Sequence, residues 1–97
     1  MNTKRTTICV DVDGTLFRAT GEVNTDIVNL IKILSRYCDV FVWSGGGNAY
    51  AKQRARDAGV IDYIQDAISK LEVDKIGKPD ITFDDQDYLL GKVNIKI

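Results

Sequence analysis

Asp11 and Asp13 lie one residue apart, directly after a short apolar run, and are followed by Gly14 and Thr15. Two carboxylates at this spacing repel each other unless a cation or hydrogen bonds stabilise their ionised forms. The pattern Asp-x-Asp-Gly-Thr should arise by chance in roughly one in a thousand chains of this length. The alternative is an acidic turn at a strand end, in which Thr15 caps the local backbone. The rarity of the pattern favours a reactive or cation-binding acidic site over such a turn.

The composition restricts the chemistry that these residues can join. The chain has no histidine, which excludes Ser–His–Asp and Cys–His catalysis, histidine-ligated zinc and imidazole bases. Its two cysteines, Cys9 and Cys38, lack a Cys-x-x-Cys spacing and are interpreted as buried, reduced thiols of a cytosolic protein. Thirteen Lys and Arg against fourteen Asp and Glu give a net charge of −1, so no overall basic field favours nucleic acid or anionic membrane. Catalysis would therefore depend on carboxylates, lysine, hydroxyls or a bound metal.

The length of 97 residues and the 44% hydrophobic composition are typical of one globular domain, residues 1–97. Lys4 and Arg5 lead into only three consecutive apolar residues before Asp11, which is too short a run for a signal peptide. No apolar run approaches the roughly 18 residues that a membrane span requires. We therefore expect a cytoplasmic protein with no membrane contact.

Short apolar runs alternate with amphipathic segments along the chain. Asn24 and Asn48 are typical helix caps, and Gly59 suits the left-handed position that ends a helix. The apolar runs predict strands at 6–10, 40–43, 63–68, 81–83 and 93–97, the last as a half-buried edge strand. Helical spacing predicts helices at 25–37 and 48–58 and a short helix or turn at 69–76. Strands separated by helices imply an α/β fold, a three-layer, Rossmann-like, mostly parallel sheet flanked by helices.

Polar segments directly follow three of the predicted strands. Residues 11–15 follow the first strand, residues 44–48 the second, and residues 84–85 a later one. Because open parallel sheets bind ligands outside the carboxyl ends of their strands, we expect the three segments to form one site. Taken alone, the glycine-rich segment after Ser44 is equally typical of a flexible loop leading into the next helix.

The string Asp-Val-Asp-Gly-Thr-Leu at 11–16, placed after an N-terminal apolar strand, resembles the first motif of the haloacid dehalogenase-like (HAD) phosphohydrolase superfamily. The family's second motif is a Ser or Thr that ends the next strand, and Ser44 fits it. Its fourth motif is an acidic pair that ends a further strand, and Asp84 with Asp85 matches that form. Only the first motif is specific by itself, and the others count through their order along residues 8–85.

The family's third motif is a lysine shortly before the acidic pair. Lys78, in the string Gly-Lys-Pro, fits this motif, with Lys75 as a second choice. The resemblance implies that this lysine offsets negative charge on the transferring phosphoryl group. Without the other motifs, Lys78 would be interpreted as a solvated surface lysine before a proline.

The resemblance also implies roles for the other motif residues. Asp11 would attack phosphorus as the nucleophile and form an aspartyl-phosphate. Asp13 would protonate the leaving oxygen and then deprotonate the water that hydrolyses the intermediate. The hydroxyl of Ser44 and the amide of Gly45 would hold the phosphoryl oxygens.

A metal ion is implied as well, because a phosphate repels an attacking carboxylate. Mg²⁺ fits this need, since it prefers oxygen ligands and commonly binds substrate phosphate. The resemblance assigns it an oxygen of Asp11, the backbone carbonyl of Asp13 and the carboxylate of Asp85. Asp84 would be either a second ligand or a group that orients water or the lysine.

Many members of the family carry a cap domain that selects the substrate, and this chain has no room for one. Residues 17–24 allow only a turn and a short flap, and residues 60–77 are needed for the sheet. The minimal, capless core would leave an open site, covered by a phosphorylated macromolecule, a nucleotide or a partner subunit. Four side chains near the predicted mouth either grip such a substrate or are ordinary solvated and core residues: Arg18, Trp43, Tyr50 and Lys52.

The sequence therefore predicts a Mg²⁺-dependent phosphatase that works through Asp11. A phosphoacceptor or phosphate-binding module without turnover, similar to response-regulator receivers, is the alternative. Receivers place the acceptor on a middle strand of the sequence, whereas Asp11 ends the first. Carbon-centred dehalogenation on the same fold is a third reading, which would require neither Asp13 nor a metal.

Overall fold

Parallel pairing joins the five strands of the described residues into one sheet. The computed structural model describes residues 5–97, so Lys4 of the charged N-terminal segment lies outside the described residues. The sheet has the order β3-β2-β1-β4-β5. The strands are β1 (Thr7–Asp11), β2 (Asp39–Ser44), β3 (Asp66–Ser69), β4 (Ile81–Asp84) and β5 (Val93–Lys96). Over residues 5–97, no helix combines the length and apolar character needed to cross a membrane.

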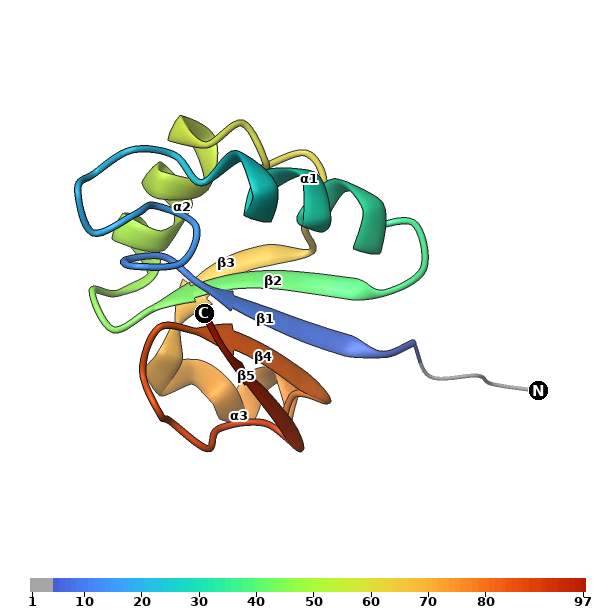
Figure 1. Ribbon diagram of the computed structural model, residues 1–97. Helices are drawn as coiled ribbons and strands as arrows, with labels where there is room; N and C mark the ends of the chain where they lie inside the picture. The colour runs from blue at the N-terminus through green and yellow to red at the C-terminus, as the bar shows by residue number, and fades with distance from the viewer. Residues whose placement is uncertain (1–4) are drawn as a thin grey trace.

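Helices cover both faces of this sheet. Two of them, α1 (Thr25–Leu34) and α2 (Asn48–Asp57), lie on one face, and the short α3 (Val73–Ile76), preceded by the 3₁₀ turn η1 (Lys70–Glu72), lies on the other (Figure 1). The predicted α/β fold, a three-layer Rossmann-like sheet flanked by helices, is confirmed. The strand order is the doubly wound one, in which β2 and β3 are added on one side of β1 and β4 and β5 on the other, so the switch point lies between β1 and β4.

Alternate residues of the strands point to opposite faces of the sheet and pack into two separate apolar cores. The larger core, beneath α1 and α2, contains Ile8 and Val10 of β1 together with Ile31 of α1. The smaller core, beneath α3, contains Cys9 and Trp43. Burial raises the pKa of the Cys9 thiol to about 12, which keeps it protonated, whereas Cys38 is only partly buried. Every residue of β1 is buried, as expected for a central parallel strand covered on both faces.

The boundaries of two elements differ from the sequence prediction. The first helix ends at Leu34 instead of residue 37, where the Ser35 hydroxyl donates to the Lys32 carbonyl and the Arg5 guanidinium donates to the Ser35 carbonyl. These bonds satisfy carbonyls that a longer helix would otherwise use. The third strand starts at Asp66, because the amide of Tyr63 donates to the Val60 carbonyl in a turn.

Both asparagines predicted to cap helices have other partners. Asn24 occupies the N-cap position of α1, but its side chain makes no capping bond and accepts from Arg18. Asn48 is the first residue of α2 itself, and its side chain accepts from the Ser69 amide and donates to Glu72. This asparagine therefore ties the start of α2 to the end of β3. Gly59 has the predicted positive φ, +73°.

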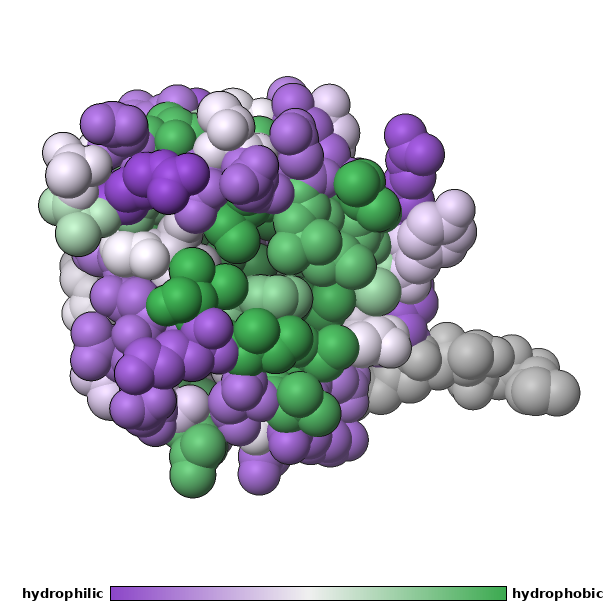
Figure 2. Space-filling view, viewed as in Figure 1, coloured by the Kyte–Doolittle hydropathy of each residue, from purple (hydrophilic) through white to green (hydrophobic). Residues whose placement is uncertain are grey.

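The edge strand β5 is more exposed than the half-buried strand that the alternating pattern predicts. Residues 85–92 connect β4 to β5 without a helix, and Val93, Ile95 and Ile97 are at least 40% exposed. Figure 2 shows apolar side chains gathered on this face of the molecule, between α1 and β5. The sequence pattern gives the side on which a residue lies, but it does not tell whether any element covers that side.

Two isoleucines of α1 provide a matched test of the larger core. Ile31 is fully buried and Ile33 is 57% exposed. We expect Ile31→Ala to lower the free energy of unfolding by about 2–5 kcal/mol, because it leaves a cavity, and Ile33→Ala to change it by roughly 0.5 kcal/mol or less. Urea denaturation followed by circular dichroism measures both. Equal losses in the two variants would contradict this packing of α1.

Candidate functional site

Three carboxylates converge at the carboxyl edge of the sheet, where β1 and β4 end. Val10 pairs with Phe83, so the residues that follow them, Asp11 and Asp84, end side by side, and Asp85 comes next. One carboxylate oxygen from each of the three lies within 4.8 Å of the others. Asp11 and Asp84 are buried, with 5% and 3% exposure. The fold thus brings together the first and fourth predicted motifs at the point where strand order reverses.

Lys70 lies between two of these carboxylates. Its Nζ is 2.9 Å from an oxygen of Asp11 and 2.8 Å from an oxygen of Asp84. Burial opposes the charged ammonium, but hydrogen bonds to Asp84 and Asp11 and their negative charges outweigh it, so the pKa of Lys70 is raised. This lysine is therefore a fixed positive charge within the acidic cluster.

Lys70, and not Lys78, is the lysine that the structure brings to the acidic cluster. Lys78 is exposed and precedes β4, at the amino edge of the sheet, where the nearby Asp80 amide donates to the carbonyl of Thr7. The second choice, Lys75, forms an exposed ion pair with Glu72. The signal for Lys70 was its position directly after β3, at the same edge as the other motifs. The sequence predicted that the strand ends at residue 68, before its observed end at Ser69, and the expected motif places its lysine nearer to Asp84 in the sequence, so neither expectation indicated Lys70.

Burial raises the pKa of Asp11 to about 6, from an ordinary 3.8. The hydrogen bond and charge of Lys70 oppose this shift, and the negative charges of Asp84 and Asp85 add to it. The Thr15 hydroxyl donates a long hydrogen bond of 3.5 Å to the Asp11 carboxylate, a contact between side chains and not the backbone cap of the alternative acidic turn. Asp11 is thus held in a site that penalises its charge unless more positive charge arrives.

Asp13 lies at the exposed rim of the site and is held by a tyrosine. The Tyr50 hydroxyl, from the first turn of α2, donates to Oδ1 of Asp13 at 2.7 Å. This hydrogen bond is the main reason that the pKa of Tyr50 is raised. Gly46 makes room for the tyrosine ring, because a Cβ there would come within 2.8 Å of it. Asp13 therefore has one carboxylate oxygen fixed by Tyr50 while the residue lines the site pocket.

Ser44 and the glycines after it form the opposite wall. Ser44 is buried at the end of β2, and its Oγ accepts from the Gly46 amide at 3.0 Å. Since that oxygen acts as an acceptor, its own hydrogen remains available to donate. Gly45 is exposed and lines the same pocket. The second predicted motif thus faces the acidic cluster.

Gly14 is required for the approach of Asp85. Its φ is +83°, a conformation that favours glycine, and a Cβ at this position would overlap the Asp85 carboxylate. The Asp85 carboxylate therefore packs directly against the backbone of Gly14, in the space that a side chain would fill. Three carboxylate donors in such a cradle fit a hard cation such as Mg²⁺, which prefers oxygen ligands.

These residues surround one open pocket with a volume of about 680 Å³, of which part is open to solvent. Its walls come from the ends of β1, β2 and β4 and from η1. The lining residues are Asp11, Asp13, Ser44, Gly45, Gly46, Lys70, Asp84, Asp85, Gln86 and Tyr88. Of the predicted site residues, only Lys78 lies outside it.

Comparisons with family models, curated proteins and solved structures found no match to this chain. The expected resemblance to the HAD-like phosphohydrolases therefore rests on the sequence motifs alone.

The raised pKa of Asp11 predicts a pH-dependent gain in stability for Asp11→Asn in metal-free buffer. Between pH 3.8 and about 6 the folded chain binds a proton at Asp11 that the unfolded chain has released, so this group lowers stability as the pH rises. We expect the free energy of unfolding of the variant to exceed that of the wild type by about 1–3 kcal/mol at pH 7. The difference should shrink toward pH 4.

Urea titrations at both pH values measure the effect, with Asp62→Asn, an exposed turn aspartate, as the control. A lower free energy of unfolding for Asp11→Asn at pH 7 would contradict this expectation. It would show that the ion pair with Lys70 stabilises the fold by more than burial of the charged Asp11 carboxylate destabilises it.

Proposed function

We propose that the protein is a Mg²⁺-dependent phosphatase of the capless HAD-like type, which hydrolyses phosphomonoesters through an aspartyl-phosphate on Asp11. The observation that carries the proposal is the convergence of Asp11, Asp84 and Asp85 with Lys70 in one pocket. The pocket also contains a serine and glycine amides for phosphoryl oxygens and a separate aspartate at its rim.

In the first step, a carboxylate oxygen of Asp11 forms a bond to phosphorus while the bond from phosphorus to the ester oxygen breaks. The leaving oxygen takes a proton from the free oxygen of Asp13, whose other oxygen stays bonded to Tyr50. The Ser44 hydroxyl and the amide of Gly45 donate to the phosphoryl oxygens, and Lys70 offsets their charge.

In the second step, water hydrolyses the aspartyl-phosphate. Asp13, now ionised, accepts a proton from the water as its oxygen attacks phosphorus, and the bond from phosphorus to Asp11 breaks. Inorganic phosphate and free Asp11 result. The ester has been converted to an alcohol and phosphate with one water consumed, and Asp13 has regained its proton.

The metal would be held by Asp11 and Asp85, with Asp84 and the backbone carbonyl of Asp13 as further candidates. Its chemistry when bound is to neutralise the repulsion between the Asp11 carboxylate and the incoming phosphate. Asp84 is already paired with Lys70, which favours Asp85 as the acidic-pair residue with free oxygens for a cation. Within residues 5–97, the Asp85 carboxylate accepts a single hydrogen bond, of 3.3 Å, from the Gln86 side chain.

The proposal predicts phosphate release from a panel of phosphomonoesters in Mg²⁺ and its loss in EDTA. Asp11→Asn should lower kcat by at least about 10³-fold, because the nucleophile is lost. Lys70→Met should lower kcat/KM by roughly 10²-fold, because the phosphoryl group loses its cation. Colorimetric phosphate assays measure all three.

Lys78→Met is the matched control, since it removes an exposed lysine from the opposite edge of the sheet and should leave the rate within about twofold. Folded, Mg²⁺-binding protein that releases no phosphate from any ester would refute the proposal. Stoichiometric labelling by a small phosphodonor without turnover would instead support the phosphoacceptor alternative.

Tyr50→Phe tests the assignment of Asp13 as the acid. Removal of the hydroxyl frees Asp13 from a 2.7 Å hydrogen bond, so proton donation to the leaving oxygen should be less well positioned. We expect kcat/KM for an alkyl phosphate to fall about 3- to 10-fold. An aryl phosphate, whose phenolate leaves with little protonation, should change by roughly twofold or less.

Tyr88→Phe removes a hydroxyl from another tyrosine of the pocket wall and should change neither rate. Equal losses for the alkyl and aryl esters in Tyr50→Phe would assign the tyrosine a purely structural function.

A further inference from the structure

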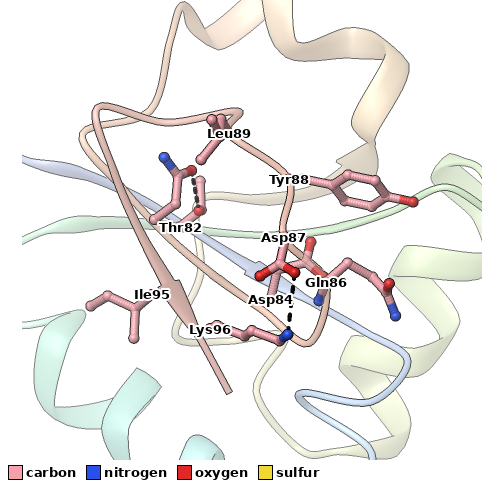
Figure 3. Close-up of a pocket in the computed structure, with 9 residues that line it drawn as sticks. Thr82, Asp84, Gln86, Asp87, Tyr88, Leu89, Ile95 and Lys96 are labelled. Carbon is pink, nitrogen blue, oxygen red and sulfur yellow. Dashed lines mark hydrogen bonds and ion pairs between the residues drawn. The ribbon is translucent and has the colours of Figure 1, made fainter.

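A second pocket adjoins the site across the segment that follows β4. It has a volume of about 290 Å³, of which part is open to solvent, and lies between this segment and β5. It shares Asp84, Gln86 and Tyr88 with the site pocket. Figure 3 shows Tyr88 extending from the segment on the side away from β5, while Ile95 and Lys96 lie on β5 itself. A substrate that enters the site can therefore continue over Gln86 and Tyr88 into this second pocket.

The walls of the second pocket combine apolar surface with a carboxylate. Leu89 is 81% exposed and Ile95 is 40% exposed, so both present apolar surface to a ligand. Asp87 lines the same pocket, and its side chain is 82% exposed. Such a surface matches a long side chain with an apolar stem and a cationic end, which means lysine or arginine.

Lys96 already contacts Asp87, but it does not saturate the carboxylate. The two groups are 3.3 Å apart and both are well exposed, a geometry in which ion pairs contribute little. The carboxylate offers two oxygens, and the contact uses one of them. An incoming guanidinium or ammonium can bind the other oxygen or replace Lys96.

The charge of the site pocket disfavours substrates with additional phosphates. Four carboxylates line it against the single ammonium of Lys70, which is engaged by Asp11 and Asp84. One divalent cation would still leave an excess of negative charge before the phosphoryl group enters. A second phosphate, as in a nucleoside diphosphate or a polynucleotide, would find no other cation among the described residues that line this pocket.

The two cations expected near the mouth are also engaged elsewhere. Arg18 donates to Asn24, and Lys52 donates to the Ala67 carbonyl and pairs with Asp66. They give no reason to expect that a polyanion is gripped at the rim.

We propose that the substrate is a phosphopeptide segment with a lysine or arginine beside the phosphorylated residue. The phosphoryl group enters the site pocket and the cationic side chain binds at Asp87 in the second pocket. This inference rests on the proposed phosphatase function and adds the class of substrate to it.

The test uses three peptides that carry one phosphoserine in the same backbone, flanked by arginine, alanine or glutamate, together with a nucleoside diphosphate. We expect kcat/KM for the arginine peptide to exceed that for the glutamate peptide at least about tenfold at low ionic strength. The ratio should narrow as salt screens the charges. The nucleoside diphosphate should be the poorest substrate.

Two charge reversals of equal size locate the effect. Asp87→Lys should reduce the arginine-to-glutamate ratio to about twofold or invert it. Asp62→Lys makes the same change of net charge on an exposed turn before β3, at the opposite edge of the sheet, and should keep the wild-type ratio.

The inference would be overturned, and the phosphatase function would stand, if the wild type hydrolysed the arginine and glutamate peptides at equal rates. The same holds if the wild type preferred the glutamate peptide or the nucleoside diphosphate, or if Asp87→Lys left the arginine-to-glutamate ratio unchanged. If no ester is hydrolysed, the proposed function fails, and calorimetric titration with the same peptides still decides the inference. Tighter binding of the arginine peptide, lost in Asp87→Lys, would then support it, and equal binding of all three would refute it.

Discussion

The carboxyl edge of the sheet depends on the ammonium group of Lys70, which lies between the carboxylates of Asp11 and Asp84. Because Val10 pairs with Phe83, the register makes these two aspartates neighbours, and both are buried. Buried like charges destabilise a fold unless a cation compensates them. The lysine therefore allows β1 and β4 to end in acids, and the two carboxylates keep one negative charge that a single ammonium does not compensate.

The sheet was predictable because each strand has a local signal. Continuous β-branched and apolar runs identify strands that are covered on both faces, and Gly59 was correctly expected to adopt a positive φ after α2. The ends of elements were less predictable, since they depend on partners distant in sequence. Arg5 shortens α1 from thirty residues away, and the exposure of β5 reflects a covering element that the described residues do not supply.

The site was partly predictable for the same reason. Asp11, Ser44 and the acidic pair follow strands, so the rule that parallel strands place their carboxyl ends together was enough to group them. Lys70 obeys this rule too, but the weak pattern of β3 concealed where that strand ends. The contact of Tyr50 with Asp13 spans 37 residues and depends on how α2 packs, which no local pattern encodes.

The connection between β4 and β5 ties the wall of the second pocket to the integrity of the sheet. Parallel neighbours usually need a crossover of a dozen or more residues, and here residues 85–92 suffice. Its far end is fastened where Leu90 packs into the smaller core and the Gly91 amide donates to Asn94. Insertions and deletions are ordinarily tolerated in a binding loop, but here they would shift the register of β5. Residues 85–92 can therefore exchange side chains without disturbing the sheet, but they cannot change in number.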